Sequence, residues 1–191
     1  IIQYPQDIIA FQEIVYSTKP DLIIETGIAH GGSLILSASL LCLIDIMNGL
    51  DPKESPRKVI GIDIDIREHN LRALNNHPLK YKIDLIEGSS TDKKIVKKVE
   101  SKAKNYQKIL VALDSNHSHE HVLQELNAYA NLVSLGSYCI VFDTIIEYLP
   151  EGSFPERNWD VGNNSMTALE EWLIKNKNFK SDLSIDEKLL I

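Results

Sequence analysis

The sequence predicts an α/β fold with a mostly parallel central sheet and helices on both faces. Short apolar runs rich in β-branched residues alternate with segments of helical periodicity, which is the pattern of successive βαβ units. The first run leads into a glycine-rich loop, and the predicted strands end in acidic residues. A length of 191 residues suits one domain with a full core, so we expect a single domain over residues 1–191.

Five strands and six helices are expected in alternation. The strands span Leu22–Glu25, Lys58–Asp63, Ile83–Glu87, Ile109–Asp114 and Tyr138–Asp143. The helices span Asp7–Ser17, Ser33–Met47, Glu68–Asn75, Asp92–Ala103, His119–Ala130 and Ser165–Asn176. The tail Phe179–Ile191 has two short strand patterns that join near Asp186, and we expect an antiparallel hairpin at the sheet edge.

Two stretches without periodicity are expected to be loops. Asn48–Arg57 is polar and contains two prolines, so it is a surface excursion. Tyr148–Asn164 is longer and contains Pro150, Gly152 and Pro155. A loop of this length inside a compact domain usually acts as a lid or a binding loop.

The loop after the first strand is predicted to cradle a ligand. Residues 21–33 read Asp-Leu-Ile-Ile-Glu-Thr-Gly-Ile-Ala-His-Gly-Gly-Ser. Glycines there allow a tight turn and close backbone approach, and the helix start behind them favours an anionic group. The spacing from Glu25 through Gly27 to Gly31 and Ser33 differs from the G-x-G-x-x-G of dinucleotide folds and is typical of S-adenosylmethionine (SAM) methyltransferases. The alternative is a structural glycine-rich turn.

Acidic residues gather at the predicted carboxyl edge of the sheet, where α/β folds bind ligands. The strands end with Glu25, Asp63, Glu87, Asp114 and Asp143. Such a rim suits a ligand that is cationic or rich in hydroxyls, and SAM supplies a sulfonium, an ammonium and a ribose diol. Asp63 is placed to accept the ribose hydroxyls, and Asp65 is the second candidate for this role. The alternative for Asp63 is a helix N-cap or a contact with solvent.

The segment after the third strand is predicted to border the adenine. Gly88, Ser89 and Ser90 follow Glu87 directly. The hydroxyls there have a second possible role, which is to cap the helix that starts near Asp92.

The densest polar cluster of the chain is Asp114–His121. Asp114 and Asp143 close neighbouring predicted strands, so their carboxylates can converge on one hard cation such as Mg²⁺. A metal bound to a substrate hydroxyl lowers its pKa, and His117 is placed to take the proton. A zinc site that includes His119 or His121 is the rival, but the order is not H-E-x-x-H and no cysteine lies nearby. We expect His119 and His121 to lie on a partly exposed helix surface.

The composition excludes several classes of protein. A net charge of −7 and the absence of a basic stripe argue against nucleic-acid binding. Cys42 and Cys139 are expected to be core thiols. The longest apolar run, Leu34–Ile44, is too short to span a bilayer, and no signal peptide is visible, so we expect a cytoplasmic protein. Because the chain begins at Ile1 rather than Met, we expect trimmed ends. The sequence leaves open whether the protein forms a homo-oligomer.

The motifs together resemble the cephalosporin hydroxylase family, which is built as SAM-dependent methyltransferases and includes rhamnosyl O-methyltransferases. The matching segments are residues 25–33, 59–67, 86–92, 113–122 and 136–144, in order through nearly the whole chain. The resemblance implies a Rossmann-like methyltransferase fold and a Mg²⁺ site at Asp114 and Asp143. It also implies SAM contacts, which are Glu25, Gly27, Ser33, Asp63 and Ser90.

The chain is similar, more distantly, to catechol-type O-methyltransferases, whose general base lies three residues past the first metal aspartate. That position is His117 here. Relatives can carry an acid just before the second metal aspartate, whereas this chain has Phe142. Its metal would therefore depend on further ligands, for which Thr144, Glu147, Asn116 and water are candidates.

These observations predict a Mg²⁺-assisted, SAM-dependent O-methyltransferase that acts on a hydroxyl of a sugar or a small secondary metabolite. Asp114 and His117 are the expected catalytic pair, and Asp114 also borders the cofactor. The alternative is a SAM-binding partner or regulatory protein without catalysis, which Phe142 keeps open. A nicotinamide-dependent sugar enzyme is disfavoured by the glycine spacing and by the lack of a Tyr-x-x-x-Lys pair near the fourth strand.

Overall fold

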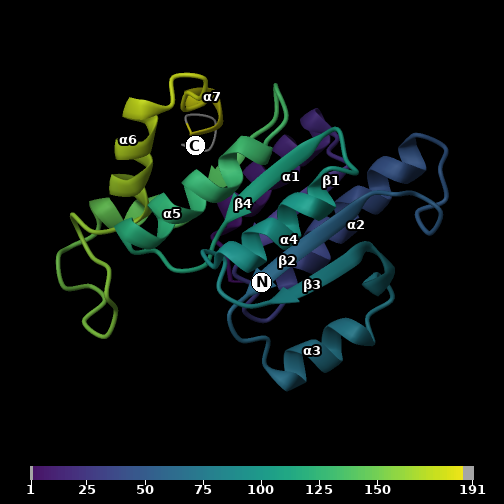
Figure 1. Cartoon of the computed structure of the whole chain (residues 1–191), viewed down its shortest axis with the longest axis horizontal. Coiled ribbons are helices and arrows are strands. Elements are labelled where there is room, and N and C mark those ends of the chain that lie inside the picture. The colour runs from purple at the N-terminus through teal and green to yellow at the C-terminus, as the bar shows by residue number, and fades with distance from the viewer. Residues whose placement is uncertain (1, 187–191) are drawn as a thin grey trace.

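The computed structural model describes residues 2–186 and contains one five-stranded sheet in the order β3-β2-β1-β4-β5 (Figure 1). All four strand pairs are parallel. The strands are β1 Leu22–Thr26, β2 Lys58–Asp63, β3 Ile83–Glu87, β4 Ile109–Leu113 and β5 Cys139–Val141. The predicted α/β fold with a parallel sheet is therefore confirmed for this part of the chain.

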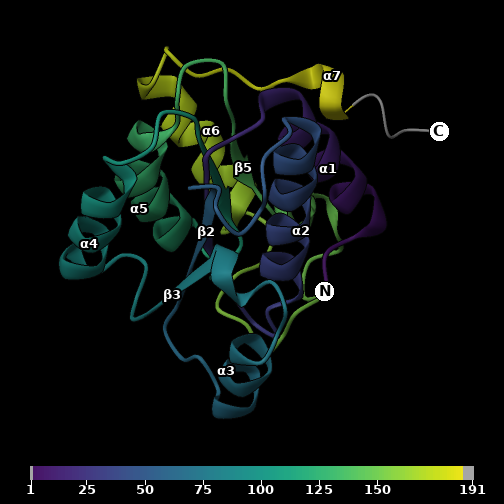
Figure 2. The same cartoon turned by 90° about the vertical axis from the view of Figure 1, so that its right-hand side faces the viewer.

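Helices cover both faces of the sheet. They are α1 Pro5–Thr18, α2 Gly32–Met47, α3 Glu68–Asn75, α4 Lys93–Ala103, α5 His119–Tyr129, α6 Ser165–Lys175 and the short α7 Leu183–Asp186. Three short 3₁₀ helices lie in the connections between elements: Lys80–Lys82 before β3, Ala130–Leu132 after α5 and Thr144–Tyr148 after β5. Figure 2 shows α1 and α2 on one side of the strands and α4 and α5 on the other.

Two hydrophobic clusters fill the spaces between the sheet and its helices. Ile23 packs with α1 and α2 in one cluster, whereas Leu22 and Ile24 pack with α4, α5 and α6 in the other. Neighbouring residues of β1 thus enter opposite clusters, as the alternating geometry of a strand requires. All five residues of β1 are buried, which explains why this strand is a continuous apolar run ending in two buried polar residues.

The six predicted helices and five predicted strands are all present, with ends that shift by one or two residues in most cases. β5 is shorter than predicted, because Asp143 has left-handed backbone angles (φ 57°) and the strand ends before it. The two cysteines, which were expected to be core thiols, are free; Cys42 is buried and Cys139 is partly buried.

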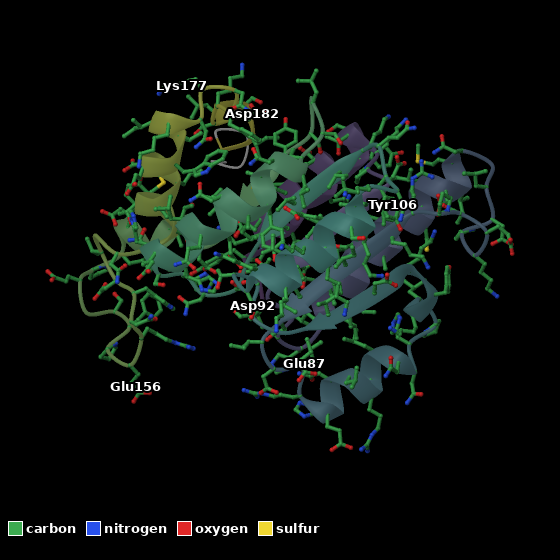
Figure 3. All side chains as sticks on the ribbon, in the orientation of Figure 1. Glu87, Asp92, Tyr106, Glu156, Lys177 and Asp182 are labelled. Atoms are coloured by element: carbon green, nitrogen blue, oxygen red, sulfur yellow. The ribbon has the colours of Figure 1, made fainter. Side chains whose placement is uncertain are left out.

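The predicted C-terminal hairpin is wrong. Residues 179–182 form no strand, Leu183–Asp186 is helical, and residues 187–191 lie outside the described part of the chain. Asp182 stands just before this helix, where its Oδ1 accepts the backbone N–H of Ser184 over 3.2 Å. Its Oδ2 accepts the hydroxyl of Tyr138 over 2.5 Å, so the tail is tied to the body of the protein by a side chain instead of a strand pair. Asp182 is labelled in Figure 3.

The strand order reverses between β1 and β4, and the crevice at the carboxyl ends of these strands is where folds of this type bind ligands. Gly27 makes the close approach possible. Its φ is +85°, and a Cβ there would lie 1.9 Å from the backbone oxygen of Asp114. Only glycine therefore allows β1 to turn against the end of β4.

None of the helices among residues 2–186 combines the length and apolar character that a bilayer crossing requires.

Candidate functional site

A cavity of about 670 Å³ opens at the carboxyl edge of the sheet. The loops that follow all five strands contribute to its walls. Two further segments that are remote in sequence complete it: residues 2–4 with Asp7 at the N-terminus, and residues 157–159 of the long loop. The predicted site residues that line it are Gly27, Ser33, Asp63, Ser89, Ser90, Asp114, His117 and Asp143. The volume is in the range of small-molecule sites.

Asp63 is the last residue of β2 and organises the glycine-rich loop. Its Oδ2 accepts the backbone N–H groups of Ile28 and Ala29 over 2.7 and 3.2 Å. Its Oδ1 accepts the backbone N–H of Asp65 over 3.1 Å. A carboxylate has about four acceptor positions, so Asp63 holds this loop and keeps capacity for a bound hydroxyl. The second candidate, Asp65, does not line the cavity.

Glu25 lies beneath the cavity instead of on its wall. It is 3% exposed and accepts the hydroxyl of Ser33. Burial, followed by the charge of Asp114, raises its pKa to about 8 although the Ser33 hydrogen bond acts in the opposite direction. At neutral pH the Glu25 carboxyl is therefore largely protonated and can donate a hydrogen bond.

Gly31 and Gly88 shape the backbone and do not line the cavity. Gly31 has a φ of +79°, stands at the N-cap of α2 and donates its N–H to Ile28 over 2.7 Å. Gly88 donates its N–H to the backbone oxygen of Asp63 over 2.7 Å and has a φ of +144°. The α4 N-cap is Asp92 itself, which accepts the N–H of Lys94 over 2.6 Å, so Ser89 and Ser90 are not its capping residues.

A polar network that the sequence analysis missed supports the side of the cavity near Ser90. Nε2 of His121 lies 3.2 Å from the Ser90 hydroxyl and 3.1 Å from the Ser115 hydroxyl. Ser115 donates to the fully buried Glu125 over 2.7 Å, and His121 lies 3.4 Å from the same carboxylate. The i,i+4 spacing of His121 and Glu125 is the signal that would have suggested this pair.

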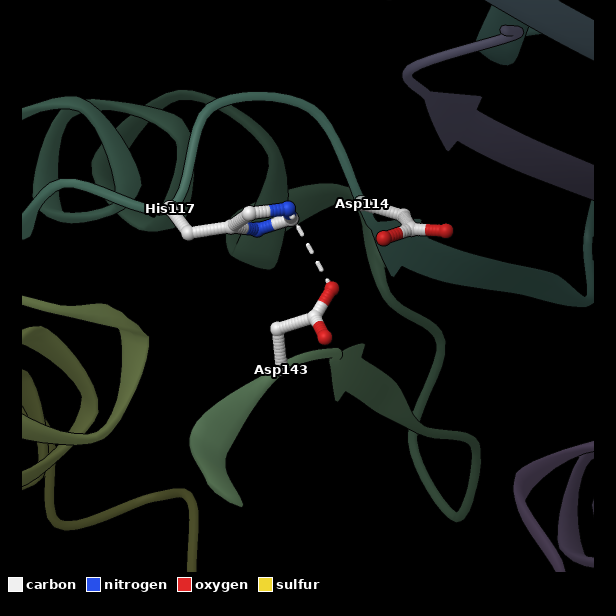
Figure 4. A group of neighbouring side chains, drawn as sticks. All are labelled: Asp114, His117 and Asp143. Atoms are coloured by element: carbon white, nitrogen blue, oxygen red, sulfur yellow. Dashed lines mark ion pairs between the residues drawn. The ribbon is translucent and has the colours of Figure 1, made fainter. Parts of the chain in front are cut away.

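Asp114, His117 and Asp143 form a compact group at the ends of β4 and β5 (Figure 4). One ligand atom from each residue lies within 4.8 Å of the others, and His117 Nε2 is 3.2 Å from Asp143 Oδ2. Burial and then the charge of Asp143 raise the pKa of Asp114 to about 7. Burial lowers the pKa of His117, against the opposing effect of Asp143. Two carboxylates and one imidazole at this spacing suit a divalent cation.

Two of the other residues suggested as ligands have hydrogen-bond partners within the protein, and the third lies away from the cavity. Glu147 accepts hydrogen bonds from the Gly162 N–H over 2.8 Å and from Asn164 Nδ2 over 2.6 Å, so it closes the long loop. Asn116 lines the cavity but accepts the N–H of Ser118 over 2.9 Å. Thr144 begins a 3₁₀ helix and does not line the cavity.

His119 lies apart from the group of Asp114, His117 and Asp143. It is 2.8 Å from the Thr167 hydroxyl and 3.1 Å from Glu171, so it joins α5 to α6. The side chains of His119 and His121 are 29% and 23% exposed, which agrees with the expected partly exposed helix surface. Their hydrogen bonds, however, commit both to partners within the protein.

The long loop folds over the acidic group. Its Trp159 ring meets the His117 ring edge-on at a centroid distance of 5.4 Å. Phe154 packs against the same indole at 4.6 Å, and the Arg157 guanidinium lies 5.8 Å from it. The predicted binding loop therefore supplies an aromatic wall next to His117, which composition alone did not indicate.

A family profile described as Rhamnosyl O-methyltransferase/CmcI matches residues 1–191. The chain belongs to this family. A rhamnosyl O-methyltransferase of Mycobacterium tuberculosis (strain ATCC 25618 / H37Rv) is 32% identical over 141 residues, which are 73% of this chain and 52% of the relative. The chain thus spans about half the length of the curated relatives it matches. The resemblance inferred from the sequence segments is confirmed.

Solved methyltransferase structures share the fold. MycE from the mycinamycin biosynthetic pathway, in complex with Mg and S-adenosylhomocysteine (SAH), has a TM-score of 0.53 at 22% identity, covering 93% of this chain and 42% of MycE. A CmcI structure with Mg and SAM has a TM-score of 0.54 at 18% identity, covering 97% of this chain and 67% of CmcI. At such identities the likeness concerns the fold.

Proposed function

We propose that this chain is a SAM-dependent, Mg²⁺-assisted O-methyltransferase domain over residues 1–191, acting on a hydroxyl of a sugar or a small secondary metabolite. The observation that carries the proposal is the group of Asp114, His117 and Asp143, which lines the cavity of about 670 Å³ together with the glycine-rich loop. Membership of the Rhamnosyl O-methyltransferase/CmcI family supports this reaction class. The Mg found with MycE and CmcI supports the metal.

SAM would occupy the part of the cavity between the ends of β1, β2 and β3. Gly27 lines this part of the cavity and lets β1 turn against the end of β4, and Asp63 would accept the ribose hydroxyls. Ser89 and Ser90 line the same side, and His121 holds the Ser90 hydroxyl. The protonated Glu25 would support Ser33 from below.

Asp114 and Asp143 would hold the Mg²⁺. When bound, the ion would lower the pKa of the acceptor hydroxyl and orient it. His117 would take the proton from that hydroxyl at Nε2. Its burial lowers the pKa, so the neutral base predominates near pH 7. The Trp159 ring, against which Phe154 packs, would keep the imidazole in place. Most of the acceleration would come from holding the two reactants in line.

The test is transfer of labelled methyl from SAM to a panel of rhamnosides, other glycosides and phenols, with Mg²⁺ and with excess chelator. We expect methyl ethers on at least one hydroxyl compound, loss of turnover on chelation and recovery with Mg²⁺. Turnover that survives exhaustive chelation would show that the reaction needs no metal. Asp114 and Asp143 would then serve SAM binding or the stability of the fold.

A second candidate is a SAM-binding protein without catalysis. The apolar Phe142 beside Asp143 favours it, because β5 then offers a metal one carboxylate. Tight SAH binding without SAM turnover on any acceptor, at saturating Mg²⁺, would select this candidate over the enzyme.

A further inference from the structure

The N-terminal segment reaches the predicted metal site from the far end of the sequence. Nε2 of Gln3 donates to Oδ2 of Asp114 over 2.6 Å, across 111 sequence positions. Oε1 of the same amide is buried and has no hydrogen-bond partner among residues 2–186. A buried amide oxygen without a partner is costly, and a cation or a water beside it removes that cost.

Asp7 brings a third carboxylate to the same place. It stands in the first turn of α1 and lines the large cavity together with Asp114 and Asp143. Burial and the charge of Asp143 raise the pKa of Asp7, and Asp7 contributes in turn to the raised pKa of Asp114. These carboxylates therefore lie close enough to repel one another.

Little positive charge from the protein balances this group. Among the described residues that line the cavity, Arg157 is the one lysine or arginine, and it is exposed and directed at the Trp159 ring. Phe142, the residue before Asp143, lines the cavity too and offers no ligand atom. The site thus has surplus negative charge, and one of its three carboxylates comes from α1 instead of from a strand end.

The distances indicate how Asp7 would act. Asp7 is not in the group whose ligand atoms lie within 4.8 Å of one another, so direct coordination of the ion held by Asp114 and Asp143 is not indicated. Mg²⁺ keeps several of its waters in proteins, and those waters need acceptors. A second cavity of about 20 Å³, which Gln3, Asp7, Asp114 and Phe142 all line, has room for one water.

We propose that the N-terminal segment completes the metal site, with Asp7 accepting from a water of the ion and Gln3 orienting the Asp114 carboxylate. The inference rests on the proposed function for the presence of Mg²⁺. It adds that metal affinity depends on α1, which precedes the whole SAM-binding motif in sequence.

The test is calorimetric titration of the intact chain with Mg²⁺ alone, without SAM or acceptor. Groups that orient ligands or hold their waters typically contribute ten- to hundredfold in metal affinity. We expect Asp7→Asn and Gln3→Ala each to raise the Kd for Mg²⁺ by about that factor, while SAH affinity stays within a few-fold. Gln6→Ala and Glu156→Gln are matched controls, because both residues are exposed and line neither cavity; Glu156 lies at the tip of the long loop (Figure 3).

A compensating variant separates a ligand effect from misfolding. Phe142→Glu in the Asp7→Asn background restores a carboxylate to the wall of the same two cavities, and we expect it to recover Mg²⁺ affinity. Unchanged Mg²⁺ affinity in Asp7→Asn and Gln3→Ala, with binding lost in Asp114→Asn, would overturn this inference and leave the proposed function intact. No Mg²⁺ binding by the wild type, with SAH binding retained, would overturn the metal role and this inference together.

Discussion

Two buried polar clusters lie at opposite edges of the sheet and are balanced in opposite ways. At the amino edge, Asp45 is fully buried and accepts from Lys82 over 2.7 Å, from Ser55 over 2.6 Å and from Arg57 over 2.5 Å. At the carboxyl edge, Asp114 accepts from the neutral Gln3 and faces Asp143. One cluster contains its own cations, and the other contains almost none.

The pKa values reflect this difference. Burial alone raises the pKa of Asp45, but the hydrogen bonds from Lys82, Ser55 and Arg57 outweigh it and lower the pKa below its usual range. Burial and like charge raise the pKa of Asp114 to about 7. A cluster whose charges are paired within the protein supports the fold, whereas one with surplus charge is prepared for a ligand. Four predictions test this distinction; three concern substitutions, from the largest expected effect to the smallest, and the fourth concerns pH.

His117→Ala should lower kcat by roughly 10²–10⁴-fold, because a positioned base contributes about that much to proton transfer. SAH affinity should change little. In the wild type the rate should rise with pH through the His117 pKa, which burial holds below its ordinary value, since the neutral imidazole is the active form. The measurement is a pH–rate profile of methyl transfer at saturating Mg²⁺. A mutant within a few-fold of the wild-type kcat, with its acidic limb unmoved, would assign His117 to structure.

Lys82→Met should lower the free energy of unfolding by up to about 3–5 kcal/mol, because it removes one of the two cations that pair with the buried Asp45 and leaves only Arg57. Urea denaturation followed by circular dichroism measures it. The matched control is Lys102→Met, whose partner Asp84 is 38% exposed, and its cost should stay below about 1 kcal/mol. Equal losses in the two variants would contradict the view that the amino-edge cluster is structural.

Asp63→Ala should weaken SAH binding by roughly ten- to hundredfold, or about 1.5–3 kcal/mol, because a charge-assisted hydrogen bond to the ribose is lost. Isothermal calorimetry with SAH measures the change. Asp65→Ala serves as the control, since its side chain does not line the cavity. Because Asp63 also holds the N–H groups of Ile28 and Ala29, the folded state of the mutant is checked by circular dichroism. Unchanged affinity in a folded mutant removes Asp63 from the SAM site.

The free energy of unfolding should fall as pH rises between about 4.5 and 8 because of Glu25. The pKa of this carboxyl is raised from 4.5 to about 8 in the folded state, so the folded chain binds the extra proton over that interval. Its contribution is complete below pH 4.5 and lost above pH 8, with a slope of at most about 1.4 kcal/mol per pH unit. Denaturation of the wild type and Glu25→Gln across this range measures the effect; parallel curves would show that Glu25 is ionised throughout.

The order of strands and helices was determined by the sequence alone. Apolar runs and helical periodicity are local signals, so all five strands and six helices were predicted close to their observed bounds. The family segments and the requirement for glycine at position 27 were likewise visible, because a tight turn restricts which residue fits whatever surrounds it. Asp114 and Asp143 were predicted to meet because parallel strands end at the same edge.

The tertiary structure decided what no local pattern carries. Gln3 and Trp159 reach Asp114 and His117 from segments far away in the sequence, and the charge balance around Asp45 and Asp114 depends on which cations fold beside them. The tail shows the limit of periodicity, since its short apolar pattern suited a strand, yet Asp182 starts a helix there. Hydrogen bonds and charges act over a few ångströms in space, whatever the separation along the chain, and for this reason only the folded protein reveals them.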